Sequence, residues 1–277
     1  MKLSLVLVFV VGSIFVSHLG TSSSKSMEAR QDHIDEVDHV QPISVSTSTD
    51  TGYCHSSRSE YRRDCREIYE KCDNFEGRSG TYMIQPSGSP EPFQVYCNNS
   101  IDGGSWTVIQ RRLDGSVDFY RTWSEYKKGF GFLERDFWLG NDKLSFLTSQ
   151  KDYELRIDMN NHEGVSYVVK YSLFRVSDEW SKYKLILGDY LAESTAESDS
   201  LSYHSNMAFS TYDRDNDLNG GNCPILHGSA WWYNSCDYSD LNADYFAADG
   251  VDQSIEWTGL PGGSYNLKFV EMKVRAL

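Results

Sequence analysis

An acidic loop at residues 210–223, STYDRDNDLNGGNC, holds the side chains whose types and spacing could do chemistry. Three aspartates stand at every second position (Asp213, Asp215 and Asp217), and glycines and a cysteine follow them. Carboxylates held this close repel one another, so a bound cation or wide exposure to water must offset the cost. Hard oxygen ligands on a glycine-rich backbone suit Ca²⁺. The loop therefore indicates a calcium site or, alternatively, a solvated Asx-turn loop without metal.

The spacing of this loop excludes an EF-hand. Counted from Asp213, the sixth and twelfth positions hold Leu218 and Pro224, where an EF-hand needs Gly and Glu. The sequence also has no G-x-S-x-G nucleophile elbow and no P-loop. We therefore expect a binding protein and no enzyme.

The composition supports one large globular domain with a substantial core. The protein has 277 residues, of which 39% are hydrophobic and 14% aromatic. Its formal net charge of −14 argues against nucleic acid or anionic membranes as partners, because both need clustered Lys and Arg. Neutral or cationic ligands, or ligands held through a metal, are expected instead.

The first twenty residues have the layout of a secretory signal peptide: Lys2, an apolar run, then small and polar residues. The apolar run is too short to favour the alternative, a membrane anchor, and no later segment could span a membrane. Residues 21–52 lack aromatic residues and are rich in Ser, Thr, Asp and Glu, which predicts a flexible polar tail. The domain is expected at 53–277, in a secreted, extracellular protein.

The elements that must position the loop are short. Helical spacing at 63–72, and Ser or Asn-Asp cap signals at 124–129 and 140–150, predict short helices. Alternating, β-branched or aromatic runs predict strands at 93–97, 106–112, 153–159, 166–176 and 265–274. The mixture indicates an α+β fold with a central, mainly antiparallel sheet and a loop-rich binding subdomain.

Six cysteines in a secreted protein indicate disulfides, and zinc is disfavoured because no CxxC spacing occurs. Six cysteines allow 15 pairings, so the spacing leaves the connectivity open. Asn98-Asn99-Ser100 is a glycosylation sequon, which makes Asn98 a candidate glycan site. Trp231-Trp232-Tyr233 could stack on a sugar, although core and loop anchoring is the favoured interpretation.

Several motifs in fixed order resemble the fibrinogen-related domain family. They are DGGSWTVIQRR (102–112), DFYRTWSEYKKGFG (118–131), FWLGNDKL (137–144), the acidic loop, GSAWWYNSC (228–236) and EMKVR (271–275). The resemblance runs from about Cys65 to Leu277 and includes the short invertebrate fibrinogen-like proteins. It implies a fibrinogen C-terminal-like fold and the disulfides Cys65–Cys97 and Cys223–Cys236. Cys54 and Cys72 match no family cysteine, so they pair with each other or link two copies in a homo-oligomer.

The resemblance also assigns the calcium ligands. In the family this loop binds Ca²⁺ through two carboxylates and two backbone carbonyls, together with waters. The equal spacing to the following cysteine places these roles on Asp215, Asp217, Asn219 and Gly221. Asp213 would then lie behind these ligands without contacting the ion.

A ligand pocket is implied beside the second cysteine. In relatives the peptide before it is cis and turns two amides toward the ligand, which here would be those of Cys236 and Asp237. The aromatic wall that receives an acetyl group in ficolins is replaced by His227, Val251 and Gly263, which puts acetyl-sugar specificity in doubt. Asp252 stands where fibrin's pocket has an acidic residue for a peptide amino terminus; a plain surface charge is the alternative.

Together these features predict a secreted, calcium-binding recognition module. We expect a lectin-like protein of innate defence that binds carbohydrate, or acetylated or amine-bearing ligands. The alternative is a structural or adhesive protein that docks peptide amino termini in clot-like assembly.

Overall fold

The computed structural model describes residues 61–72, 77–248, 253–261 and 267–277. The predicted signal peptide (1–20), the predicted polar tail (21–52) and Cys54 lie outside these ranges. None of the helices in the described ranges is long and apolar enough to cross a membrane.

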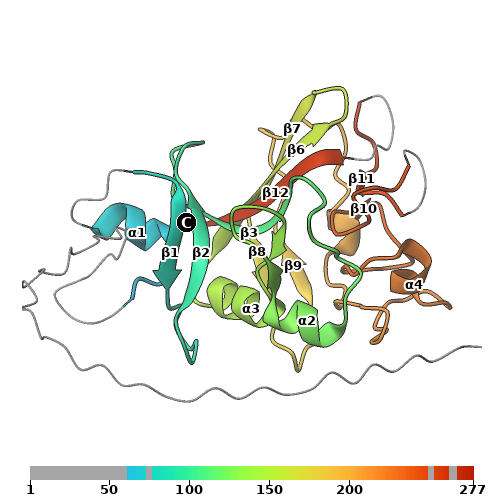
Figure 1. The fold of residues 1–277 in the computed structure, drawn as a ribbon, viewed down its shortest axis with the longest axis horizontal. Coiled ribbons are helices and arrows are strands. Elements are labelled where there is room, and N and C mark those ends of the chain that lie inside the picture. Colours follow the sequence, from blue (N-terminus) through green and yellow to red (C-terminus); the bar gives the residue numbers. More distant parts are fainter. Residues whose placement is uncertain (1–60, 73–76, 249–252, 262–266) are drawn as a thin grey trace, which may run out of the picture. The chain divides into compact units, whose positions relative to one another are not determined.

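An eight-stranded sheet with antiparallel neighbours forms the centre of the domain (Figure 1). The main path is β1-β2-β3-β12-β6-β7, while β5 pairs with β3 and β4 pairs with β5. The strands are β1 Gly80–Ile84, β2 Phe93–Asn98, β3 Trp106–Arg112, β4 Phe130–Gly131, β5 Phe137–Trp138, β6 Tyr153–Asn161, β7 Ser166–Tyr171 and β12 Leu267–Ala276. The predicted antiparallel α+β fold is confirmed.

The burial of each strand follows its sequence pattern. Along β6, buried and half-buried residues alternate at every position, as expected for a strand with one face on the core. All seven residues of β3 are buried, because β3 lies inside the sheet and both of its faces are covered. The predicted strand at 166–176 is divided in two, because Ser172 and Leu173 separate β7 from β8 Phe174–Val176.

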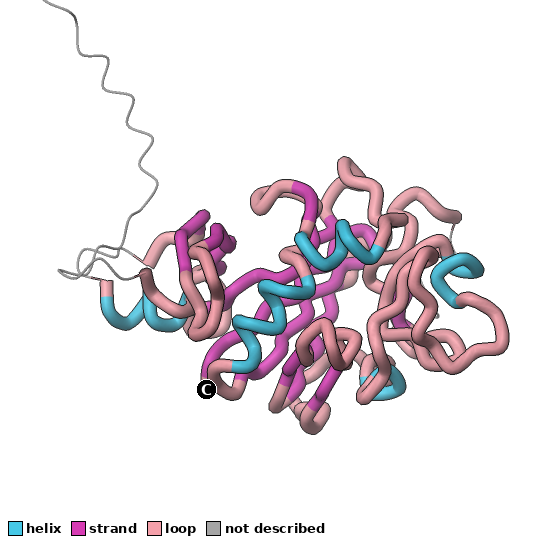
Figure 2. The backbone as a smooth tube through the Cα atoms, turned by 90° about the horizontal axis from the view of Figure 1, so that it is seen from below, coloured by secondary structure: helices cyan, strands magenta, loops and turns pink. Residues whose placement is uncertain are grey.

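Helices α2 (Trp123–Lys128) and α3 (Asn141–Ser149) lie along one face of the sheet (Figure 2). Their predicted caps were wrong. Thr122 caps α2 and forms a capping box with Glu125, which Ser124 could not do from inside the helix. Helix α3 starts after Gly140, where no side chain accepts from its first amides, since the Asn141 amide oxygen accepts from the Trp138 indole (2.9 Å).

The sheet joins two different ends of the domain (Figure 1). At one end lie β1, β2 and helix α1 (Cys65–Lys71), whose N-cap Asp64 accepts from the amide of Glu67. At the other end lies a loop-rich part with short elements. They are α4 Cys223–His227, β10 Ser239–Asp240, β11 Glu256–Trp257 and the 3₁₀ turn Ser202–His204, next to the β8–β9 hairpin, where β9 is Leu185–Leu187.

The aromatic run Trp231-Trp232-Tyr233 is fully buried under these loops. The interpretation of these residues as core anchors is therefore confirmed, and stacking of their rings on a bound sugar is excluded. Helix α4 had not been predicted from the sequence. Pro224 in its first turn and the side chain of Asn222, which accepts from the amide of Ile225 (2.9 Å), explain why it starts there.

Candidate functional site

The acidic loop is held by its own side chains. Asp215 Oδ1 accepts from the Asp217 amide (3.0 Å), Asp217 Oδ1 from the Asn219 amide (2.9 Å), and Asn219 Oδ1 from the Gly221 amide (2.9 Å). These three successive Asx turns curl the backbone around one side. The four predicted calcium ligands are thereby brought into one short, ordered turn.

Oxygen atoms remain available in this turn. Among the described residues, the backbone carbonyls of Asn219 and Gly221 accept no hydrogen bond, and no basic side chain forms an ion pair with Asp215 or Asp217. Burial and the negative charge of Asp215 raise the pKa of Asp217, even though the amides of Cys223 and Asn219 donate to it. The carboxylates thus lack a counter-charge within the described part of the protein.

These residues fit a hard cation. In the described ranges no group of three or more His, Cys, Asp or Glu side chains could hold a metal ion. Two carboxylates supplemented by carbonyl oxygens and water are instead a donor set for Ca²⁺. Asp215, Asp217 and the carbonyls of Asn219 and Gly221 would hold the ion, which would neutralise the loop.

The first aspartate of the loop has a different task. Asp213 Oδ1 accepts from the Trp123 amide (2.9 Å) at the start of α2 and from the Thr211 hydroxyl (2.7 Å). The guanidinium carbon of Arg214 lies 4.0 Å from the centre of the Trp123 ring. The loop is thereby anchored to α2 at its beginning.

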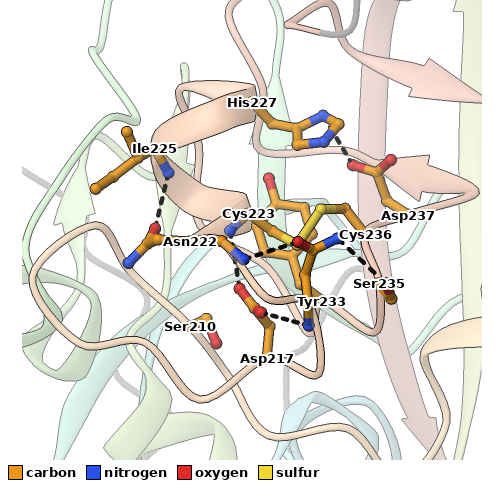
Figure 3. Close-up of a disulfide and its surroundings, with 12 residues drawn as sticks. Ser210, Asp217, Asn222, Cys223, Ile225, His227, Tyr233, Ser235, Cys236 and Asp237 are labelled. Carbon is orange, nitrogen blue, oxygen red and sulfur yellow. Dashed lines mark hydrogen bonds and ion pairs between the residues drawn. A yellow bond between two sulfur atoms is a disulfide. The ribbon is translucent and has the colours of Figure 1, made fainter.

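The end of the loop is anchored to the segment at 234–236 (Figure 3). Cys223 and Cys236 form a disulfide, and Cys65 pairs with Cys97, so both expected bridges are confirmed. The Leu218 amide donates to the Asn234 carbonyl (2.8 Å), and Asn219 Nδ2 donates to Ser235 Oγ (3.2 Å). The Ser235–Cys236 peptide is cis, as expected. Cys72 is also disulfide-bonded.

Two predicted ligand-binding residues lie against each other. His227 Nδ1 is 3.3 Å from Asp237 Oδ2, and both side chains are largely buried beside the disulfide (Figure 3). Cys236 lies beside this His227–Asp237 pair, and its amide donates to no acceptor among the described residues. Asp252, together with Val251 and Gly263, lies outside the described residues.

A stacked aromatic pair that the sequence had not indicated lies beside Asp237. Tyr238 follows Asp237 directly, is half exposed, and stacks on Tyr203 with the ring centres 4.3 Å apart. Leu218, Ile225 and Leu226 are exposed nearby on the loop and on α4. The surface beside the loop therefore offers apolar and aromatic contacts.

A buried histidine, also missed from the sequence, fixes the backbone that follows Asp237. His204 Nδ1 donates to the Trp232 carbonyl (2.8 Å), and Nε2 accepts from the amides of Tyr238 and Ser239 (3.3 Å each). Burial lowers the pKa of His204 to about 4, so the ring is neutral at physiological pH. Only the neutral ring can accept these amides.

Asn98, the predicted glycan site, lies at the end of β2. Its Nδ2 donates to Glu271 Oε1 (3.0 Å), and its Oδ1 accepts from the Ser100 amide and hydroxyl. A glycan would be attached to Nδ2, the nitrogen that donates to Glu271. Glycosylation of Asn98 stays a prediction.

Comparison with known protein families matches residues 61–277 to "Fibrinogen beta and gamma chains, C-terminal globular domain". Among curated proteins, fibrinogen-like protein A of Apostichopus parvimensis is 49% identical over 224 residues, covering 79% of this chain and 77% of that protein. Fibrinogen C domain-containing protein 1 of Xenopus tropicalis is 36% identical over 276 residues, covering 95% of this chain but 58% of the frog protein.

Solved structures give the same result. The fibrinogen-like globe domain of human ANGPTL2 matches with a TM-score of 0.73 and 38% identity, covering 78% of this chain and 99% of that one. The lamprey fibrin D-dimer, complexed with the peptide Gly-His-Arg-Pro-amide, matches with a TM-score of 0.70 and 33% identity, covering 82% of this chain and 79% of that one.

Proposed function

Because the protein belongs to the fibrinogen-related family, defined by the C-terminal globular domain of fibrinogen beta and gamma subunits, we propose that it is a secreted, calcium-dependent recognition protein. Domains of this family are generally recognition modules without enzymatic activity. The proposed ligands are carbohydrates, or acetylated or amine-bearing groups, bound in innate defence. The binding surface lies beside the acidic loop and includes Cys236, Asp237 and Tyr238.

The acidic loop carries this proposal. Its two carboxylates have no cationic partner among the described residues, and its carbonyls at Asn219 and Gly221 accept no hydrogen bond there. Bound Ca²⁺ would neutralise the loop and stiffen the segment at 234–236 to which the loop is bonded. Calcium would in this way prepare the neighbouring amides and the Tyr238 ring for a ligand.

Calorimetry on the double variant Asp215→Asn/Asp217→Asn tests the metal site. The unaltered protein should bind one Ca²⁺ in this loop with a dissociation constant of about 10⁻⁴ to 10⁻³ M, as extracellular modules do. The double variant should lose this binding, whereas the control Asp189→Asn removes an exposed carboxylate elsewhere and should keep it. Unchanged binding in the double variant would refute the assignment.

A glycan array probed in Ca²⁺ and in chelator tests the ligand. Signals that vanish in chelator and weaken in Tyr238→Ala would support the lectin-like function. Tyr238 is exposed, so its removal should leave the fold intact. Signals that survive both changes would contradict it.

Docking of peptide amino termini in clot-like assembly is the second candidate. The observation that favours it is the similarity to the lamprey fibrin D-dimer, whose structure holds a peptide ligand. Asp237, and Asp252 outside the described residues, would supply the negative charge. Binding of a short peptide with a free amino terminus, lost when that terminus is acetylated and weakened by salt, would select this candidate.

A further inference from the structure

A pocket opens on the domain away from the predicted calcium ligands. It has a volume of about 390 Å³ and lies between residues 112–120, which end and follow β3, and residues 242–246. None of the four predicted calcium ligands lines it, nor does Cys236 or Asp237; of the predicted ligand-binding residues in the described ranges, only His227 does. Its size is within the range of small-molecule sites.

The wall of this pocket includes a buried guanidinium with an unused donor, Nη2. Arg112 is 1% exposed, and its Nη1 donates to the carbonyls of Leu241 (3.2 Å) and Ala243 (2.7 Å). The Phe119 ring covers one face of the guanidinium, 3.9 Å from its carbon. Its Nε is buried and has no hydrogen-bond partner, and no hydrogen bond within the described residues uses Nη2. Since Nε is closed off from the pocket, Nη2 is the donor that remains for a ligand there.

The neighbouring arginine, Arg111, has the carboxylate partner that Arg112 lacks within the described residues. Arg111 is 6% exposed, and its Nε donates to Glu271 Oε2 at 2.7 Å. Arg112 follows it on the opposite face of β3 and has no carboxylate at ion-pair distance among the described residues. Burial lowers the pKa of Arg112, and Asp136, Asp240 and Asp244 oppose this only from a distance. A buried charge without a partner is costly, so an anion in the pocket would be bound favourably.

The remaining walls add negative charge and aromatic surface. Asp118 and Asp244 each use Oδ1 to accept an amide of their own turn, from Tyr120 (2.8 Å) and Phe246 (2.9 Å) respectively. Their second oxygens accept no hydrogen bond from the described residues. Phe246, which lines the pocket, is 74% exposed, so its ring is available to cover a ligand.

We propose that this pocket binds a small zwitterion: an amino acid or similar molecule that carries a carboxylate, an ammonium group and an apolar ring. The carboxylate accepts from Nη2 of Arg112, the ammonium pairs with Asp244 or Asp118, and the ring packs on Phe246. A plain anion would be attracted by Arg112 but repelled by the two aspartates, and a plain cation would be attracted by the aspartates but repelled by Arg112. This site goes beyond the proposed function and needs no calcium.

Binding of three matched probes to the full-length protein in chelator tests the ligand chemistry. Phenylalanine carries both charges, 3-phenylpropanoate only the carboxylate, and phenethylamine only the ammonium. Phenylalanine should bind best, and each single-charge probe should lose about 10-fold or more in affinity, since a hydrogen-bonded charge is lost. Equal affinity of phenethylamine and phenylalanine would overturn the proposal. So would no binding of any probe, because the pocket would then hold only water.

Substitutions at the walls locate the binding. Phe246→Ala and Asp244→Asn change exposed residues and should each weaken phenylalanine binding by about 3- to 10-fold without altering the melting temperature. The controls Phe132→Ala, at a ring that is 66% exposed outside the pocket, and Asp189→Asn should change nothing. Unchanged affinity in both wall variants would place the ligand elsewhere and overturn the proposal. Arg112→Lys, which keeps the charge but removes the Nη2 donor, should cost about 10-fold or more if it folds.

Discussion

The charges of the central sheet and those of the acidic loop are handled in opposite ways. On the sheet, Lys273 is 1% exposed and lies 2.5 Å from Glu271 and 2.6 Å from Asp158, while Arg111 donates to the other oxygen of Glu271. These partners come from three strands, β3, β6 and β12. In the loop, Asp215 and Asp217 accept only protein amides within the described residues. The sheet therefore supplies its own counter-charges by folding, and the loop does not.

The pKa shifts of Glu271 on the sheet and Asp217 in the loop differ in the same way. Burial alone would raise the pKa of Glu271, but Lys273 and Arg111 lower it. Burial and Asp215 raise the pKa of Asp217. A carboxylate with its counter-charge in the fold contributes to stability, whereas a carboxylate without one is ready for a ligand from outside. The charges of the sheet thus contribute to stability, whereas those of the loop fit the proposed binding of a cation.

The largest expected effect comes from breaking the sheet network. Glu271→Ala leaves Arg111 and Lys273 buried without their shared partner, and should lower the free energy of unfolding by about 3–5 kcal/mol. Urea denaturation measures it. The control Asp152→Ala removes an exposed partner of Arg175 and should cost about 1 kcal/mol or less. Equal costs would show that the sheet charges are not self-compensated.

As the pH falls, the loop-rich part should lose stability before the carboxylates of the sheet take up protons. His204 takes up a proton near pH 6.5 when unfolded but only near pH 4 when folded, so the unfolded state binds more protons between these values. The free energy of unfolding should therefore fall by roughly 3 kcal/mol as the pH drops through this window. The lowered pKa of Glu271 causes a loss only below about pH 4.5, where its unfolded form takes up a proton.

Denaturation at several pH values separates the two windows. His204→Gln should flatten the slope between pH 6.5 and 4.5. His162→Gln, at an exposed histidine in the β6–β7 turn, should leave it unchanged. An unchanged slope in His204→Gln would contradict the role given to this ring.

The smallest effect is expected from Asp215→Asn, and its sign should depend on calcium. In chelator the substitution removes repulsion from Asp217 and should stabilise the fold by no more than about 1 kcal/mol. At Ca²⁺ a few times above the dissociation constant, the unaltered protein gains roughly 1 kcal/mol that the variant lacks. Thermal melts in both conditions measure this. An unchanged difference between the variant and the unaltered protein in the two conditions would mean that no cation binds there.

Local signals in the sequence predicted much of the fold. Five strand segments were indicated by alternation or by β-branched and aromatic residues, one helix by helical spacing and two helices by cap signals, and the α+β class followed. Helix α4 was missed because its five residues are too few for a periodic pattern. Ser124 was taken for a cap because the Thr122–Glu125 box starts two residues earlier, at a residue that the predicted range did not include.

The candidate site could be predicted where its residues follow one another in the sequence. The acidic loop is one segment, and its spacing to Cys223 could be compared with a family. His204, by contrast, acts on amides 34 and 35 residues away, and Arg112 on carbonyls 129 and 131 residues away. The stacking of Tyr203 on Tyr238 likewise depends on the folded protein. Such contacts have no signature in a single sequence.

The position of β12 has a consequence for biosynthesis. Residues 267–276 form the strand between β3 and β6, so two halves of the sheet that are made earlier meet only through it. While a ribosome is still translating the preceding residues, β3 and β6 expose unpaired edges. During this time Arg111 and Asp158 also lack their ion-pair partners on β12, Glu271 and Lys273. The nascent domain must therefore stay soluble without its central strand until that strand emerges, a period in which chaperones would be needed most.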